Sequence, residues 1–171
     1  KAILNQNWNG HFTKPAPNLY PHQWNWDSGF IALGLAHFDM ERAEAEMRHL
    51  FKGQWKNGML PHIVFGKEKD AKYFPGPDFW QTKNCSQSPD NQLTSGITQP
   101  PVHGFVLWEM FQISEDKSRT INFLRELFPK VVKLHKYLYE NRDPNEEGLV
   151  YIQHPWESGT DNSPSWDNAL S

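Results

Sequence analysis

The segment at the end of the chain, HPWESGTDNSPSWDNALS (154–171), places carboxylic acids between indoles. Glu157, Asp161 and Asp167 alternate with two tryptophans, two prolines and one glycine, and aliphatic side chains are nearly absent. A structural loop needs turn formers, but it seldom interleaves them with acids and indoles. A carboxyl group between rings can stay protonated near neutral pH, because a partly apolar setting penalises its charged form. The segment is therefore either a solvated acidic loop or a site at which a carboxylic acid donates a proton.

A second stretch, NLYPHQWNWDSGF, also places rings beside an acid. Tyr20, Trp24, Trp26 and Asp27 fall within eight residues, directly before an apolar run. A hydrophobic staple with a helix cap explains the acid and one of the rings, but not all three rings. Saccharides present flat C–H faces that stack on indoles and hydroxyls that pair with carboxylates. The stretch therefore favours a saccharide pocket over a purely structural role.

Other polar residues carry weaker signals. His62 lies in GMLPHIVF, and Gln99 and His103 lie in SGITQPPVHG. The eight histidines show neither HxH nor HExxH spacing, which argues against a zinc site. Cys85 is the single cysteine, so the chain forms no internal disulfide, and its polar loop gives no sign of a catalytic thiol.

Composition narrows the class of protein. The 171 residues fit one domain, and 37% hydrophobic with 22% charged residues indicates a globular chain. The net charge of −3 and the pI of about 6.2 argue against a nucleic-acid surface. No apolar run approaches the roughly 20 residues of a membrane helix. The aromatic share of 14% is the outlier, and it suits the wall of a cleft as well as a core.

The elements that must position these residues are helices. Asp27 or Ser28 is expected to cap a helix over 27–38. A helix from residue 40 to near Gly53 has an apolar stripe of Ala43, Met47, Leu50 and Phe51, with Glu and Arg residues on the opposite face. Further helices are predicted over 98–113, with proline in the first turn, and over 118–143, broken or kinked at Pro129. Residues 147–154 are expected to form a short extended piece. Sequential helices with little strand predict an all-α array whose loops carry the function.

Four segments in this order, YPHQWNWDSGFIALGLAHFD, NGMLPHIVF, SGITQPPVHG and HPWESGTDNSPSWDN, resemble glycoside hydrolase family 63. Within that family they resemble the mannosylglycerate and glucosylglycerate hydrolases most. The likeness runs from about Asn18 to Asn168, and the acidic segment also resembles the ESG-x-D segment of trehalases, which share the same barrel. The resemblance implies an (α/α)6 barrel. Because the predicted helices make up about half of such a barrel, we interpret residues 1–171 as the N-terminal half of a single catalytic domain.

The resemblance assigns roles to the acids. Asp161 matches the general acid of the family, which protonates the leaving glycosidic oxygen. Glu157 is expected to orient the loop through hydrogen bonds. Asp167 is expected only to cap or open the helix that follows it.

The resemblance also assigns substrate contacts. Tyr73, in AKYFPGPDFW, is placed in a lid-like loop that contacts a glycerate-type aglycone. The other residues matched to sugar binding, ligand contacts or the surroundings of the acid are Tyr20, Trp24, Trp26, Asp27, His62, Gln99, Trp156 and Gly159.

The implied reaction is hydrolysis of an α-glucosyl or α-mannosyl linkage in a small glycoside, with inversion and without a metal or organic cofactor. The general base of the family is a Glu far towards the C-terminus, and no position here matches it. Two alternatives stay open. One is a trehalase or other α-glucosidase on the same barrel, and the other is an inactive barrel that only binds saccharides.

The remaining expectations concern the cell and the ends of the chain. The chain begins at Lys1 and ends within what reads as a helix start, so we interpret it as cut at both ends. The single cysteine favours a cytoplasmic location. We expect a small saccharide or glycoside as partner and neither nucleic acid nor membrane, and the sequence indicates no oligomeric state.

Overall fold

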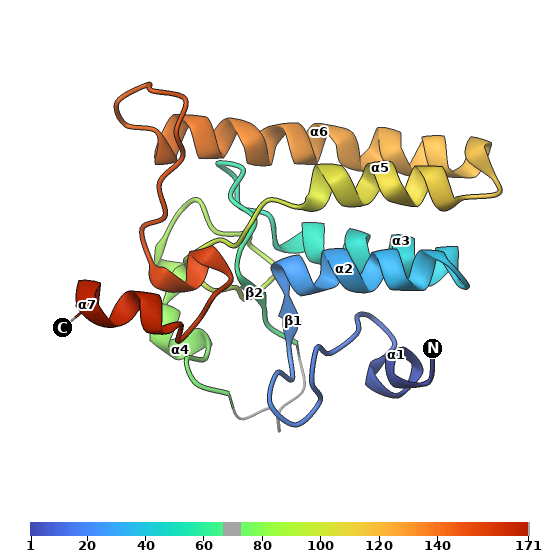
Figure 1. Cartoon of the computed structure of the whole chain (residues 1–171), viewed down its shortest axis with the longest axis horizontal. Helices are drawn as coiled ribbons and strands as arrows, with labels where there is room; N and C mark the ends of the chain where they lie inside the picture. The colour runs from blue at the N-terminus through green and yellow to red at the C-terminus, as the bar shows by residue number, and fades with distance from the viewer. Residues whose placement is uncertain (67–72, 171) are drawn as a thin grey trace.

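Two helical hairpins form the body of the protein. The computed structural model describes residues 1–66 and 73–170. Helix α2 (Asn25–Ala36) pairs with α3 (Met40–Leu50), and α5 (His103–Ile113) pairs with α6 (Lys117–Arg142). The hairpins lie side by side through α2 and α5, with both hairpin turns at one end of the molecule (Figure 1). The loops that carry the sequence motifs gather at the other end.

Short elements complete the described chain. One antiparallel pair, β1 (Gln23–Trp24) with β2 (Ile63–Val64), stands directly before α2. The remaining elements are α1 (Ala2–Asn7), η1 (Phe51–Gly53), α4 (Pro77–Trp80), η2 (Thr82–Asn84), η3 (Pro155–Ser158), η4 (Pro164–Trp166) and α7 (Asp167–Leu170), where η denotes a 3₁₀ turn. The prediction of an all-α architecture is confirmed, and Asp167 opens the last helix as expected.

The start of α2 differs from the prediction. The helix begins at Asn25, with Trp24 at the cap position and no capping side chain. Asp27 therefore lies inside the first turn, where an acid interacts favourably with the helix dipole. Ser28 instead donates its hydroxyl hydrogen to a carboxylate oxygen of Glu46 at 2.7 Å. Neither predicted cap residue caps the helix, because contacts with distant segments of the chain decide where the helix begins.

Helix α3 confirms its apolar stripe, but two of the acids outside that stripe are buried. Glu44 and Glu46 are 2% and 0% exposed. Glu46 accepts hydrogen bonds from Ser28, from the Gln23 amide at 2.9 Å and from the Thr13 backbone N–H at 2.7 Å. Burial raises the pKa of Glu46, and these hydrogen bonds oppose that shift. The buried carboxylate of Glu46 on α3 thus joins this helix to β1 through Gln23 and to α2 through Ser28.

The second hairpin corrects the predicted start of one helix and the predicted break in the other. Helix α5 begins at His103, so Pro100 and Pro101 precede its first turn. Helix α6 runs unbroken through Pro129. Its buried face contains Phe123, Leu127, Val131 and Leu134, on both sides of the proline.

The apolar residues of α6 do not all face the core. Ile121 and Phe128 are 38% and 65% exposed, whereas Val131 and Leu138 are buried. Residues 147–154 form no strand. They are tied back to the end of α6 by the Tyr151 backbone N–H, which donates to the Arg142 carbonyl at 2.7 Å.

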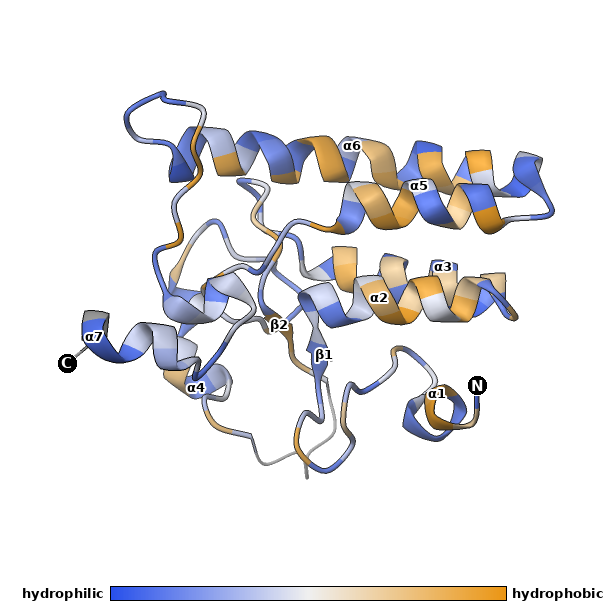
Figure 2. Cartoon of the chain, viewed as in Figure 1, coloured by the Kyte–Doolittle hydropathy of each residue, from blue (hydrophilic) through white to orange (hydrophobic). Residues whose placement is uncertain are grey.

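The core lies between the hairpins. Apolar residues concentrate on α2, α5 and the facing side of α6, whereas the loop end of the molecule is mainly polar (Figure 2). A second, smaller cluster of Trp24, Ile63 and Phe65 lies beneath the loops. Among residues 1–66 and 73–170, no helix is long and apolar enough to cross a membrane. The same residues contain no group of three or more His, Cys, Asp or Glu side chains arranged to hold a metal ion.

Candidate active site

The start of α2 is fixed by the segment that carries His62. Trp24 pairs with Ile63 across the strands, and the Asn25 backbone N–H donates to the His62 carbonyl at 3.0 Å. The Asn25 side chain donates to the Leu60 and Pro61 carbonyls at 3.1 and 3.0 Å. These bonds bring the WNWD and GMLPHIVF motifs together, although they lie far apart in the sequence.

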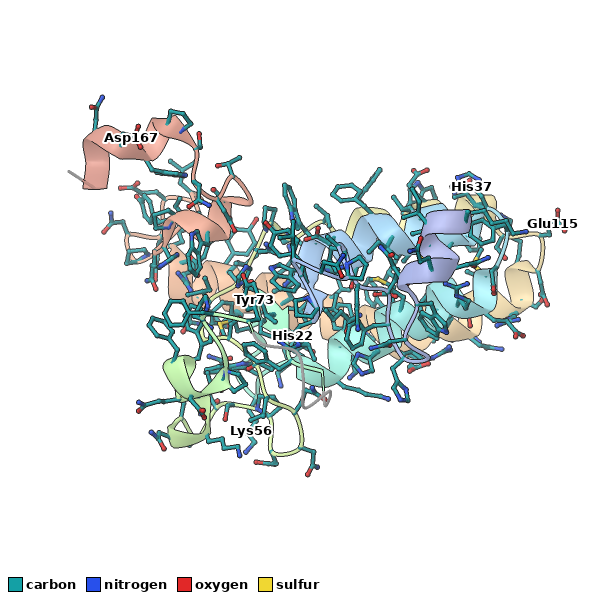
Figure 3. All side chains as sticks on the ribbon, turned by 90° about the horizontal axis from the view of Figure 1, so that it is seen from below. His22, His37, Lys56, Tyr73, Glu115 and Asp167 are labelled. Carbon is teal, nitrogen blue, oxygen red and sulfur yellow. The ribbon has the colours of Figure 1, made fainter. Side chains whose placement is uncertain are left out.

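Trp24 is the centre of an aromatic cluster and not an exposed wall. It is 4% exposed, and its ring makes edge contacts with Tyr20 and Tyr73, each with centroids 5.0 Å apart. His62 meets it edge-on at 6.1 Å. Figure 3 places Tyr73 beside His22, between the acid-bearing end marked by Asp167 and the far end marked by His37 and Glu115. Tyr20 is exposed and Tyr73 is half-buried.

Trp26 instead supports the acid loop, which is the segment after His154 that carries Glu157 and Asp161. Its backbone N–H donates to the side-chain oxygen of Gln99 at 3.2 Å. Gly159 has a φ of +75°, and a Cβ placed there would lie 2.6 Å from the Trp26 indole. Only glycine combines this left-handed backbone with such close approach. In the structure, the absence of a side chain at Gly159 allows the loop to pack on Trp26.

Glu157 anchors the same loop from the other side. It is 3% exposed, and its carboxylate accepts from the Arg142 guanidinium at 2.8 and 3.0 Å. It also accepts from the backbone N–H groups of Thr98 at 3.2 Å and Gln153 at 2.7 Å. These contacts are hydrogen bonds of the kind expected for a residue that orients the loop.

Asp161 lies four residues beyond Glu157, beside Asp27 and Tyr73. The Asp161 residue is largely exposed to solvent. The atoms packed around its carboxyl nevertheless desolvate it in part, and this raises its pKa above the ordinary value of an aspartate. His154 acts in the opposite direction. Desolvation also raises the pKa of Asp27, and the charge of Asp161 adds to that shift. The two carboxyls therefore resist being ionised together.

His62 is a neutral, buried ring. Desolvation and the neighbouring His154 lower its pKa to about 3. It is 1% exposed, and neither ring nitrogen has a hydrogen-bond partner among the described residues. Trp156 covers it, with ring centroids 6.1 Å apart. A neutral imidazole can both donate and accept a hydrogen bond, which suits contact with sugar hydroxyls.

The structure thus brings all the predicted residues to one end of the hairpins. The segment 71–80 around Tyr73 is only partly described, since residues 71 and 72 lie outside the described residues. Two supporting residues were missed in the sequence. Arg142 looks like an ordinary helix-terminal arginine, and Glu46 looks like a surface acid of an amphipathic helix. Neither has a local signal, because the partners of both come from distant segments.

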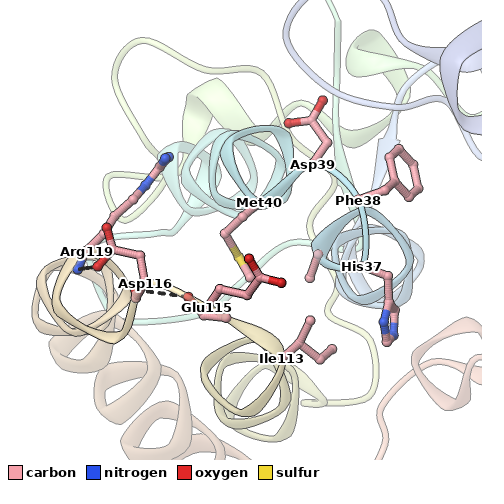
Figure 4. Close-up of a pocket in the computed structure, with 10 residues that line it drawn as sticks. His37, Phe38, Asp39, Met40, Ile113, Glu115, Asp116 and Arg119 are labelled. Atoms are coloured by element: carbon pink, nitrogen blue, oxygen red, sulfur yellow. Dashed lines mark hydrogen bonds between the residues drawn. The ribbon is translucent and has the colours of Figure 1, made fainter.

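Hollows in the surface do not all mark the site. One of about 560 Å³ flanks the acid loop, between His154, Trp156 and Trp166. Another of about 560 Å³ lies between the hairpin turns, lined by His37, Glu115 and Arg119 (Figure 4). That second hollow lies at the far end from Asp161, and Arg119 is already paired with Glu41 and Glu44. We therefore place the site at the acid-loop end.

Replacing the two tryptophans should separate structural from binding roles. Trp24→Ala removes a buried ring from the cluster and should lower the free energy of unfolding by about 3–5 kcal/mol. Trp26→Ala should cost less stability, because Trp26 is only half-buried, and should weaken saccharide affinity. Calorimetry and ligand titration on the same samples measure both. Equal stability losses with unchanged affinity in the folded fraction would show that both rings are structural.

Comparison with known proteins places this geometry in a family. Residues 20–171 match the family model described as the mannosylglycerate hydrolase MGH1-like glycoside hydrolase domain. The chain is 51% identical over 170 residues to a mannosylglycerate hydrolase of Thermus thermophilus, covering 99% of this chain and 40% of that protein. It is 44% identical over 175 residues to a glucosylglycerate hydrolase of Mycolicibacterium hassiacum, covering 99% of this chain and 39% of that protein.

Comparison with solved structures indicates the same family. The chain superposes with a TM-score of 0.89 and 50% identity on a family 63 mannosylglycerate hydrolase from Thermus thermophilus in complex with Tris and D-glycerate, covering 99% of this chain and 39% of that one. The chain thus spans about two-fifths of the length of these relatives. This share is consistent with the N-terminal part of a helical barrel, although it is smaller than the predicted half. With its family model matched over most of its length, the chain belongs to the MGH1-like glycoside hydrolases of glycoside hydrolase family 63.

Proposed function

We propose that this chain carries the general acid of an inverting glycoside hydrolase that cleaves an α-glucosyl or α-mannosyl linkage in a small glycoside. The observation that supports this most directly is the setting of Asp161. Its carboxyl has a raised pKa and stands beside Asp27 and Tyr73, in a loop fixed by Glu157 and packed on Trp26. A carboxylic acid held in this way can keep its proton until a substrate arrives.

In the proposed reaction Asp161 transfers its proton to the glycosidic oxygen as the bond from that oxygen to the anomeric carbon breaks. Water attacks the opposite face of the anomeric carbon, and a second carboxylate removes the water's proton. The free sugar therefore leaves with inverted configuration. We assign the second carboxylate to a glutamate outside residues 1–171, and we assign Asp27 to the sugar hydroxyls.

The proposed substrate is a sugar linked to glycerate. Relatives that share about half of their aligned residues with this chain are named mannosylglycerate and glucosylglycerate hydrolases. In this chain we assign the partly exposed Trp156 to stacking on the sugar, and we assign neutral His62 and Gln99, which are 1% and 4% exposed, to the buried polar wall of the pocket. Burial, together with smaller contributions from Tyr20 and Asp161, raises the pKa of the Tyr73 hydroxyl, so Tyr73 lies near the proposed acid and we place the aglycone beside it.

The test is hydrolysis by the full-length protein of three substrates: mannosylglycerate, glucosylglycerate and trehalose. Proton NMR during the first minutes identifies the anomer released. We expect the β-anomer of the sugar from one or both glycerate substrates. Release of the α-anomer would overturn inversion, and hydrolysis of trehalose alone would favour a trehalase. Binding of all three without turnover would indicate a saccharide-binding barrel.

Residues 1–171 expressed alone should neither hydrolyse these glycosides nor stay monodisperse. Phe30 on α2 is 49% exposed, and Phe105 and Trp108 on α5 are 56% and 58% exposed. Exposed apolar surface of this kind promotes association of a soluble chain. Light scattering and an activity assay measure both outcomes. A monomeric, cooperatively folding chain that turns over substrate would contradict both the partial-barrel interpretation and the assignment of the base.

A further inference from the structure

An ion pair joins the acid loop to the end of α6. Arg142 is the last residue of α6, and its side chain is 5% exposed, while that of Glu157 is 2% exposed. The two terminal nitrogens of the guanidinium each donate to a different oxygen of Glu157, at 3.0 and 2.8 Å. This two-point geometry fixes the direction of the carboxylate as well as its distance.

The arginine is itself held in place. Its Nε and one terminal nitrogen donate to the hydroxyl oxygen of Tyr137, at 3.2 and 3.1 Å, and Tyr137 is 5% exposed. Tyr137 lies on the same helix, so the guanidinium is braced against α6 before it meets Glu157. The position of the carboxylate is therefore set by the helix and not by the loop.

Glu157 is connected through further contacts to the segments on both sides of the site. The backbone N–H of Thr98 donates to the carboxylate, and the next residue, Gln99, accepts from the backbone of Trp26. Trp26 in turn packs against Gly159, two residues before Asp161. The acid loop is thus held between the Arg142–Glu157 pair and Trp26. The hydrogen bond from the Ser158 hydroxyl to the Pro155 carbonyl, in contrast, is local to the loop.

We propose that Arg142 is a positioning residue for the general acid: by clamping Glu157 it fixes the acid loop and so aims Asp161 at the glycosidic oxygen. This inference rests on the proposed function. Among the described residues, the hydrogen bonds of the Arg142 side chain go to Tyr137 and Glu157, and none joins it to Asp161 or to the assigned sugar contacts. We therefore assign Arg142 to the transfer of the proton and not to the affinity for the sugar.

The test compares substrates that do and do not need a proton donor. In the full-length protein, Arg142→Met should lower kcat for the glycerate substrate by about 10²-fold, because misplacing a reacting group by about 1 Å costs that much. The KM should change little. Most of the loss should disappear with the corresponding α-glycosyl fluoride, whose leaving group departs as fluoride without being protonated. Arg142→Lys keeps the positive charge but cannot form the two-point hydrogen bond to Glu157. Its kcat for the glycerate substrate should therefore lie between that of the wild type and that of Arg142→Met.

Arg119→Met is the matched control. Arg119 also joins carboxylates on a neighbouring helix, at 2.9 and 3.2 Å, but at the hairpin-turn end of the molecule. It should leave kcat for both substrates unchanged. A kcat loss in Arg142→Met that is equal for the glycerate substrate and the fluoride would overturn the proposal and show a general structural role.

Hydrogen exchange separates this inference from the proposed function. The backbone N–H groups of Thr98 and Gln153 should exchange faster in Arg142→Met than in the wild type, because both donate to Glu157. If the wild type hydrolyses no glycoside, the proposed function fails and the assignment of Arg142 to proton transfer fails with it. Unchanged exchange in an active enzyme whose variant still loses kcat would instead overturn the clamp alone.

Discussion

Asp161→Asn should lower kcat for the natural glycoside by at least about 10²–10⁴-fold while leaving binding of the substrate largely intact. An amide has the size of the acid but no proton to transfer to the leaving oxygen. The raised pKa of Asp161 supports this expectation, because it favours the protonated acid more than in an ordinary aspartate. Steady-state kinetics and calorimetric titration of the full-length variant measure the two effects separately.

Glu157→Gln is the comparison for this prediction. The substitution removes the charge that meets Arg142 and disturbs the loop, but it leaves the proposed proton donor in place. It should therefore cost less activity than Asp161→Asn. An equal or larger loss would transfer the role of acid to Glu157, and a near-native rate in Asp161→Asn would exclude Asp161.

The same assignment fixes the direction of a pH effect. The acid must be protonated, so kcat/KM should fall as pH rises through its pKa, and burial moves this fall to a higher pH than an ordinary aspartate would give. Asp27 and Asp161 repel one another when both are ionised. Because the two groups titrate together, Asp27→Asn should move the fall towards lower pH. A shift towards higher pH in the pH–rate profile would contradict the coupling.

Gly159→Ala should lower kcat by about 10²-fold, because it displaces the acid loop. The residue has a φ of +75°, which costs an alanine about 1–2 kcal/mol. The added methyl group would also lie 2.6 Å from the Trp26 indole, so the ring or the loop must move. Chemical denaturation and steady-state kinetics of the full-length variant measure the two consequences.

Gly148→Ala provides a matched control. Gly148 has a φ of +76°, and a Cβ at that position would meet nothing within 4 Å. The variant should therefore show the backbone penalty without loss of kcat. If Gly159→Ala also kept full activity, the contact with Trp26 would have no part in placing Asp161.

Local patterns in the sequence determined the helices and the broad character of the site. Residues three and four positions apart share a face of a helix, so the stripe of Ala43, Met47 and Leu50 could be read directly. The acids and indoles that indicated a saccharide site are also close in sequence, and residues that are close in sequence stay close together in a loop. The ordered motifs then identified the family, which the comparisons confirm.

Tertiary packing decided what the local patterns left open or indicated wrongly. Proline costs about 3 kcal/mol inside a helix, yet α6 continues through Pro129. Each large apolar side chain that it buries on either side stabilises it by about 1.5–3 kcal/mol, and together these outweigh the cost. Glu46 reads as a surface acid until Ser28, Gln23 and Thr13 surround it.

The clamp on the acid loop shows the same limit most clearly. Arg142 and Glu157 lie fifteen residues apart, and their pairing depends on where the loop returns to α6. Trp26 and Gly159 come from opposite ends of the chain, so no short pattern records their contact. The types of residue that do the chemistry are a property of the sequence. The positions and directions of these side chains are set by long-range contacts, because the energy of such a contact depends on a distance that only the folded chain defines.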